Sequence, residues 1–472
     1  MVRGSEGPKV VALIAALLLP GAAAAQAGLT AAPQIGRVYD AILDARFDEV
    51  PALVRGACPP APLEVCGLLD VQALWWRIQL DPDNTAYDAS FRSKVDASIA
   101  AMDAWTTREP QRAEAWFYLG GAYGARSQHR VLRGQVLAAA RDGKRIKEAL
   151  ERALALDPRL DDAWFGIGLY HYYADVAPAA AKLLRFLFLL PGGDRDEGLR
   201  EMLRARDGGQ LLRSEADYQL HIIYLWYEKA PARAIALVDG LRRRYPANPH
   251  FPQVIAEIQD VYLHDPTASL RSWQALLALA DAGAVREAEM AGARARLGMA
   301  VQLDRLSETD RAIDQLDALL AARPDAPAGV MTRATALHRT FERRMADPAY
   351  RLSLEGWRAF ERGDLETAAR ALAQSIALRG GDPVTRYRQA RLLVARGEPA
   401  AALPIFEGIL RDRSRTPPTV YAEACVEAAR IHARAGDVAR AASLYADAST
   451  VFGADERTKA DARREAARLT TR

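Results

Sequence analysis

A regular spacing of glycine turns constrains the fold of this chain more than any other feature. Gly363 is followed 34 positions later by Gly397, and Gly436 comes 39 positions after that. Small and large residues follow these turns at helical spacing: Ala368, Leu372 and Ser375, then Ala402, Phe406 and Ile409, then Ala441, Tyr445 and Ala448. Internal repetition at this period predicts stacked helical units rather than one continuous core.

Helical spacing of apolar residues extends over the rest of the chain, and alternating, strand-like runs are scarce. Hydrophobic residues make up 50% of the 472 residues, and charged residues make up 26%. This much apolar surface excludes disorder as the dominant state, so we expect an all-α fold. The formal net charge of +3 is too near balance to indicate nucleic-acid binding.

A first-helix pattern, Trp-x-x-Leu-Gly-x-x-Tyr, recurs upstream at Trp116, Leu119, Gly120 and Tyr123. With the 34-residue period, it resembles the tetratricopeptide repeat (TPR) family, whose unit is a helix, a tight turn and an antiparallel helix. The resemblance implies a TPR-like α-α superhelical solenoid, with a degenerate region at 35–345 and a C-terminal TPR array at 346–470. It places Trp116 and Trp164 in the core. Residues 127–144 are an insertion beyond the repeat, which we expect to be helical.

A second motif lies in the middle of the chain, at Leu190-Pro191-Gly192-Gly193-Asp194-Arg195 with Glu197-Gly198-Leu199. It resembles a signature of exported bacterial TPR proteins and, more distantly, mitochondrial outer-membrane TPR proteins of the inclusion-body-clearance class. Asp194 is predicted to cap the helix that follows. Those families are poorly defined in function, so the resemblance implies fold and context but no activity.

The first 25 residues have the layout of an export signal. Arg3 and Lys9 form a basic region, residues 10–19 are apolar, and residues 22–25 are small alanines suited to cleavage. The apolar run is too short to span a bilayer as a helix. An uncleaved N-terminal anchor is the alternative. The Ala- and Arg-rich composition suggests a bacterial source, so we expect a signal peptide at 1–25 and a periplasmic location.

Three cysteines are too few for a fold built on disulfides. Cys58 and Cys66 flank a proline-rich segment, and the oxidising periplasm favours a disulfide between them. Two buried thiols are the alternative. Cys425 lies on a helical apolar face with Tyr421 and Ala428, so we interpret it as a small core residue.

Recognised catalytic and metal-binding motifs are missing from the sequence, including His-Glu-x-x-His, Gly-x-Ser-x-Gly and the P-loop. His171 and His221 fall at core positions of first helices. We therefore expect no enzymatic activity, cofactor or metal. An enzyme of unfamiliar type is the alternative; it would need a polar pocket in which Asp, Glu and His converge.

In the TPR family the first helix of each pair lines the concave side of the superhelix. Counted from the repeat anchors, the positions expected in that groove are Phe165, Leu169, Tyr172, Gln219, Ile223, Trp226, Trp357, Phe360, Tyr387, Arg391 and Arg430. Aromatic and arginine side chains are enriched at binding hot spots, which favours recognition of a peptide or helix. The alternative is that degenerate repeats bury these rings inside the solenoid.

We therefore expect an exported, non-catalytic scaffold that binds a protein partner in its groove within the cell envelope. The most apolar segment begins at Ala179 and ends at Leu190, and it is too short to span a membrane. It is interpreted as a buried helix, or as a helix on a lipid surface with Lys182 and Arg185 toward the headgroups. A membrane- or lipid-associated transport or assembly factor is the second hypothesis.

Overall fold

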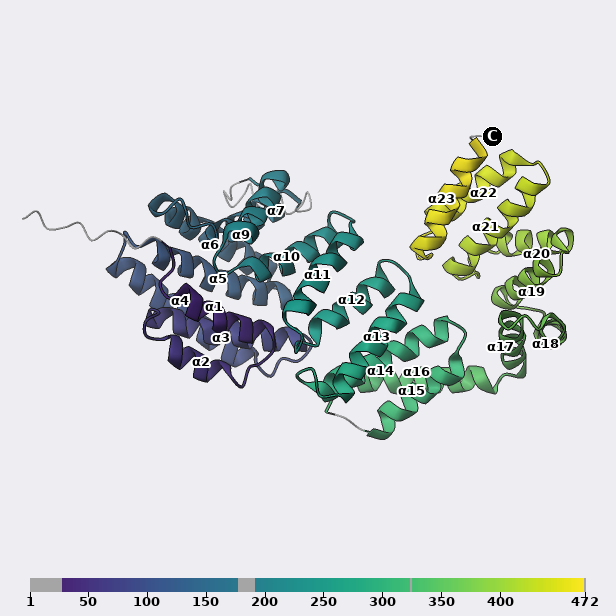
Figure 1. Ribbon diagram of the computed structural model, residues 1–472, viewed down its shortest axis with the longest axis horizontal. Helices are drawn as coiled ribbons and strands as arrows, with labels where there is room; N and C mark the ends of the chain where they lie inside the picture. The colour runs from purple at the N-terminus through teal and green to yellow at the C-terminus, as the bar shows by residue number, and fades with distance from the viewer. Residues whose placement is uncertain (1–27, 177–191, 323–324, 471–472) are drawn as a thin grey trace, which may run out of the picture.

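The computed structural model describes residues 28–176, 192–322 and 325–470. Within these ranges the chain forms 22 α-helices and no strand, which confirms the all-α, TPR-like fold class. The signal peptide predicted at 1–25 and the apolar segment that ends at Leu190 lie outside the described residues. In the described ranges, no helix combines the length and the apolar character that a bilayer span requires. Figure 1 shows the helices winding from a broad N-terminal body into a C-terminal arc.

The N-terminal body consists mainly of antiparallel helix pairs, of which α5 with α6 and α7 with α9 pack most extensively. Its core includes the fully buried rings of Trp76, Trp105 and Phe91. The helices are α1 (Ala32–Leu43), α2 (Val50–Ala57), α3 (Leu63–Leu80), α4 (Asp88–Arg108), α5 (Ala113–Leu132), α6 (Val136–Leu156), α7 (Ala163–Val176), α9 (Arg195–Gly208), α10 (Arg213–Trp226) and α11 (Pro231–Arg244).

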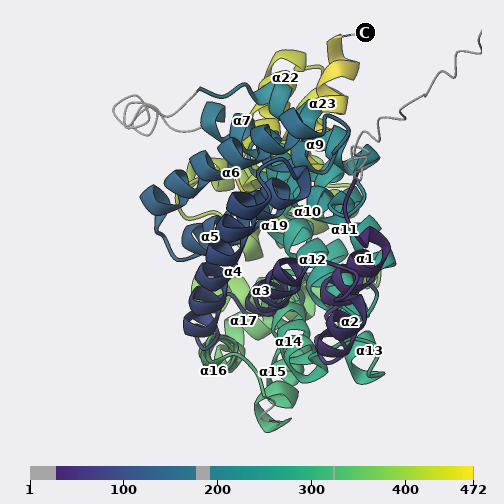
Figure 2. The same cartoon turned by 90° about the vertical axis from the view of Figure 1, so that its left-hand side faces the viewer.

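The end of α1 lies beside the segment between α11 and α12, about 205 residues later in the chain. Figure 2 views the molecule from the side of these N-terminal helices. The side chain of Asn248 donates to the carbonyl of Leu43 at 2.6 Å, and the Tyr245 hydroxyl donates to Asp40 at 2.8 Å. Repeats of a solenoid ordinarily contact only their neighbours. This long-range packing therefore makes the N-terminal body more compact than a plain array.

The middle of the chain leads into the C-terminal arc, whose first helices α17, α19 and α21 lie on the inner side of the curve, with α18 and α20 outside (Figure 1). The middle helices are α12 (His250–Val261), α13 (Pro266–Asp281), α14 (Ala288–Arg305), α15 (Thr309–Ala322) and α16 (Ala328–Ala346). The arc contains α17 (Pro348–Glu361), α18 (Leu365–Arg379), α19 (Pro383–Ala395), α20 (Pro399–Arg411), α21 (Pro418–Arg434), α22 (Val438–Thr450) and α23 (Glu456–Thr470).

The same left-handed turn joins the two helices of successive pairs. In the arc, the residues with positive φ in these turns are Gly363, Gly397 and Gly436. Upstream, the equivalent positions are occupied by Lys229, His264 and Ser307, with φ of 51°, 50° and 67°. At all six turns the next N–H bonds to a carbonyl at the end of the preceding helix. The repeat thus continues where its glycine signal is lost, although a left-handed conformation is unfavourable without glycine.

The hydrophobic core is interrupted at the junction of α16 and α17. The apolar cluster of the middle helices ends at Phe341, and a separate cluster begins at Ala359. Polar contacts cross the junction; for example, the hydroxyls of Tyr350 and Thr309 lie 2.8 Å apart.

Trp116 and Trp164, which we expected in the core, lie half-buried at its edge. The neighbouring Phe117, Tyr118 and Leu119 of α5 are buried instead. The 127–144 insertion lengthens α5 and α6, with a turn at Gly134.

The helix cap at Asp194 and the states of the three cysteines agree with the predictions. Asp194 caps α9 and accepts the N–H of Glu197 at 2.9 Å, as predicted. The structure joins Cys58 to Cys66 through a disulfide, and Cys425 is buried in the arc's core.

Candidate functional site

Two aromatic rings lie side by side on α17, a helix on the inner side of the C-terminal arc. Trp357 and Phe360 are one turn apart on α17, and their ring centroids are 5.0 Å apart at an interplanar angle of 25°. Both side chains are half-buried. The Trp357 ring also lies 6.5 Å from that of Tyr387 on α19, which is buried. The stacked helices therefore bring together rings that the sequence placed in separate units.

Arginines of α19 cover these rings. The guanidinium of Arg391 lies 6.0 Å from the Phe360 ring and 5.8 Å from the Tyr387 ring, and it donates to the Tyr387 hydroxyl at 2.8 Å. Arg388 lies 5.8 Å from the Trp357 ring. Arg388 is buried, and this burial lowers the pKa of its guanidinium. Cation–π contacts of this kind hold the rings in fixed orientations.

The charges continue onto α21 and α23 in an alternating order. Glu427 lies 3.9 Å from Arg391 and 3.0 Å from Arg430, and Arg430 lies 3.9 Å from Glu465. Burial raises the pKa of the neighbouring Glu423, an effect that Tyr387 and Arg391 oppose. We name the surface made by Trp357, Phe360, Arg391, Glu427 and Arg430 the inner strip.

The inner strip contains four of the eleven predicted groove residues: Trp357, Phe360, Arg391 and Arg430. Tyr387, which was also predicted to line the groove, is buried in the core of the arc, so that prediction is wrong. About a third of the Arg391 and Arg430 side chains is exposed, 33% and 37% respectively. Half-exposed rings beside partly exposed guanidiniums are the composition of a binding surface. The strip as described has no nucleophile beside a general base, and no cluster of His, Cys, Asp and Glu in the described ranges could hold a metal ion.

Four groove residues predicted in the N-terminal body are buried instead. Phe165, Tyr172 and Ile223 belong to an apolar cluster between α7, α9 and α10, and Gln219 is buried nearby. Leu169 is half-buried against the same cluster. The prediction that these side chains line an open groove is therefore wrong, and the alternative that degenerate repeats bury them holds here.

The reason is the close packing of α9 on α7. A Cβ atom at Gly168 would lie 2.7 Å from the carbonyl oxygen of Gly198, so the two helices touch through glycine backbones. This approach covers the face of α7 that the repeat pattern leaves open. Tyr172 donates to Glu228 at 2.5 Å within the covered region. Trp226, at the end of α10, is the exception, since 61% of its surface is exposed.

The histidines of the N-terminal body have structural partners. His171 lies 2.8 Å from Glu201. His221 is buried and bonds through Nδ1 to the carbonyl of Tyr218, whose hydroxyl lies 2.9 Å from Nε2 of His250. Burial lowers the pKa of His221 to about 4 and that of His250 to about 3. These buried, neutral rings are suited to packing rather than to proton transfer.

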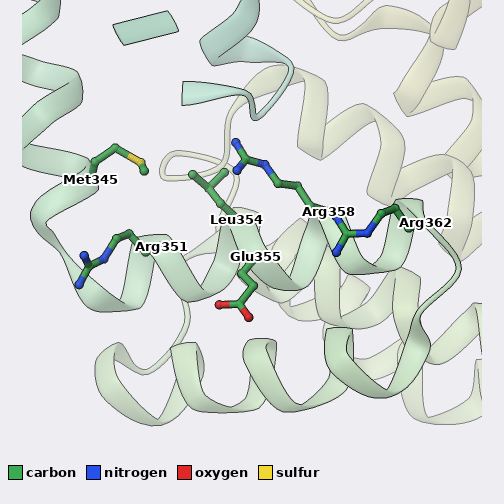
Figure 3. Close-up of a pocket in the computed structure, with 6 residues that line it drawn as sticks. All are labelled: Met345, Arg351, Leu354, Glu355, Arg358 and Arg362. Carbon is green, nitrogen blue, oxygen red and sulfur yellow. The ribbon is translucent and has the colours of Figure 1, made fainter. Parts of the chain in front are cut away.

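A cavity of about 330 Å³, which was not among the predicted sites, lies at the junction of α16 and α17. Figure 3 shows its six lining residues: Met345, Arg351, Leu354, Glu355, Arg358 and Arg362. Arg358 also pairs with Asp310 of α15. The spacing of Arg351, Arg358 and Arg362 along one helix face is the signal that predicts such a cationic surface.

Comparisons with known proteins bear on the fold alone. No family model matches the chain, and no curated protein matches it. Among solved structures, the TPR domain of P58(IPK) covers 85% of this chain and 98% of its own length, at 13% identity and a TM-score of 0.27. A TPR protein from Parabacteroides merdae covers 75% and 99%, at 15% identity and a TM-score of 0.32. Yeast Tom70 covers 91% and 87%, at 10% identity and a TM-score of 0.26. At these values the similarity carries no inference about partners.

Proposed function

We propose that this chain is a non-catalytic scaffold that binds a peptide or helix of a protein partner along the inner strip. The observation that carries the proposal is the partly exposed stack of Trp357 and Phe360 on α17, a helix on the inner side of the arc (Figure 1). Rigid aromatic rings and arginines supply most of the binding energy at many interfaces. Glu427 and Glu465 already pair with the strip's arginines, so the partner contributes apolar side chains to the rings.

The proposed location is the bacterial periplasm, reached through a cleavable signal peptide at 1–25. The disulfide between Cys58 and Cys66 supports this location, because such bonds persist in oxidising compartments. Mass spectrometry of the protein from a periplasmic extract tests the proposal. We expect a mature N-terminus at Gln26, whereas recovery of the intact chain from Met1 contradicts it.

A photoreactive amino acid at position 357 tests the binding site. We expect a crosslinked partner in intact cells, and we expect Phe360→Ser to weaken capture at least about tenfold while the helical circular dichroism is unchanged. A photoreactive residue at position 452 is the matched control, because Phe452 is 91% exposed outside the strip. Equal capture at both positions contradicts the proposal. Unfolding of the Phe360→Ser variant would place that ring in the core.

A further inference from the structure

Three aliphatic side chains are exposed together where α5 turns into α6. The exposed fractions are 60% for Val131, 66% for Val136 and 55% for Leu137. This turn belongs to the 127–144 insertion, which the repeat does not require. It lies in the N-terminal body, away from the arc that bears the inner strip (Figure 1). Exposed aliphatic clusters of this kind mark contacts with a partner or a membrane.

Ion pairs fix the end of the hairpin in this position. The guanidinium of Arg133 binds both carboxylate oxygens of the buried Asp88, at 2.7 and 2.9 Å. Nearly two turns into α6, the buried Asp142 accepts from Arg126 at 2.7 Å and from Arg130 at 2.6 Å. These ion pairs tie the hairpin end to α4, and its aliphatic side chains are left exposed.

A basic stripe runs back from Leu137 along α6. Residues 126–147 contain seven lysines and arginines and a single carboxylate. Arg141, Lys144 and Arg145 follow Leu137 by four, seven and eight positions, so they share its helix face. At 1.5 Å per residue they lie about 6 to 12 Å behind it.

The stripe retains most of its positive charge. Arg141, Lys144 and Arg145 are all exposed. Glu148 lies 3.8 Å from Lys144 and 3.9 Å from Arg145. All three side chains are exposed, and ion pairs between exposed side chains are weak. Arg141 makes no ion pair with any residue in the described ranges. The hairpin end thus has two parts. Val131, Val136 and Leu137 form an aliphatic tip, which we name the apex, and Arg141, Lys144 and Arg145 form a cationic region behind it, which we name the collar.

We propose that this hairpin end contacts an anionic lipid surface. Val131, Val136 and Leu137 enter the boundary between headgroups and acyl chains, and the basic stripe binds the lipid phosphates. The spacing between apex and collar matches the depth of about 5 to 10 Å at which apolar faces lie in a bilayer interface. Anionic lipids attract each exposed Lys or Arg near the surface.

A lipid surface fits the hairpin end better than a protein does. A stable protein interface buries about 800 Å² on each partner, which three aliphatic side chains do not provide. A bilayer deforms around a narrow convex end and needs no complementary groove. This contact is independent of the inner strip, so its failure in a test leaves the proposed scaffold function untouched.

Co-sedimentation of the full chain with vesicles tests the proposal. One set of vesicles contains phosphatidylcholine alone, and the other contains phosphatidylcholine mixed with phosphatidylglycerol. We expect binding to the anionic vesicles that weakens with added salt. The double variant V136E/L137E should lower that binding at least about tenfold. Both positions are exposed, and far-ultraviolet circular dichroism checks that the variant is folded.

Two further variants complete the design. The triple variant R141Q/K144Q/R145Q should remove the preference for anionic vesicles, because it removes the collar and leaves the apex. Phe452→Glu, which changes a more exposed ring elsewhere, should leave binding unchanged. The N-terminal residues and the segment ending at Leu190 are identical in all variants, so differences report on the hairpin alone. No vesicle binding by the unaltered chain, equal binding by V136E/L137E, or a change only in oligomeric state would overturn the proposal.

Discussion

The backbone N–H of Glu456 donates to the carbonyl of Leu263 at 3.0 Å. Glu456 is the first residue of α23, and Leu263 lies in the turn between α12 and α13, so the end of the chain returns to its middle (Figure 1). Repeats ordinarily contact only their neighbours, and this contact joins distant ones. The contact therefore joins the two ends of the segment from α12 to α23. The helices that carry the inner strip lie between these two ends.

A pair of cysteines at these two positions should form a disulfide. A backbone hydrogen bond places the two Cα atoms within the distance that a disulfide bridges. We expect Leu263→Cys with Glu456→Cys to crosslink within one molecule on mild oxidation, as detected by peptide mass mapping. Leu263→Cys with Val438→Cys is the control, because Val438 is exposed at the start of α22. Equal crosslinking of the two pairs would show that the contact is not specific.

The glycine contact between α7 and α9 predicts a large loss of stability on a small change. A methyl group at Gly168 would meet the carbonyl oxygen of Gly198, and backbone cannot move aside as a side chain does. We expect Gly168→Ala to lower the free energy of unfolding by about 3 kcal/mol in urea titrations. Gly124→Ala, in open space on α5, should instead raise it by up to about 1 kcal/mol. Similar effects of the two variants would contradict this packing.

The buried Cys425 should be inert in the folded protein. Burial raises the pKa of its thiol to about 12, so the reactive thiolate is scarce at neutral pH. We expect alkylation with iodoacetamide to label no cysteine in the native protein and Cys425 alone in urea. Adding a reductant to the urea should release Cys58 and Cys66 as well. Labelling of three cysteines without a reductant would rule out the disulfide.

The sequence predicts helix pairs well where glycine occupies the left-handed turn, as at Gly363 and Gly397. At Lys229 and His264 the backbone makes the same turn without glycine, since packing of the flanking helices outweighs the local cost. The glycine signal is missing at these turns, although Pro231 and Pro266 mark the starts of the helices that follow, and for this reason the upstream repeats look degenerate.

The packing of neighbouring helices decides which face of a helix is exposed. The repeat pattern alone therefore cannot predict the exposed face of every helix. For α17 the pattern is sufficient, because α18 and α19 pack where the repeat requires, and Trp357 stays half-exposed. For α7 it fails, because α9 approaches through Gly168 and Gly198 and buries Tyr172. The pairing of those two glycines is evident only once the helices are placed together.

Two buried histidines make the N-terminal body sensitive to acid. Burial lowers the pKa of His221 to about 4 and that of His250 to about 3. Below about pH 6.5 these histidines therefore take up protons in the unfolded chain that they exclude in the folded chain, and their contribution to stability falls as the pH falls toward 4. Burial also raises the pKa of Glu215, whose contribution has the opposite sign: it favours the folded state as the pH falls through that raised pKa.

Replacing His221 with Gln should remove one of these proton-linked sites. Each such histidine contributes up to about 1.4 kcal/mol per pH unit. We therefore expect the difference in unfolding free energy between about pH 6.5 and about pH 5 to shrink by about 2 kcal/mol. Ile222→Ala, on the same helix, is the control, since it lowers stability at both pH values and leaves the difference unchanged. A His221→Gln variant that keeps the full difference would show that this ring is already protonated in the folded chain.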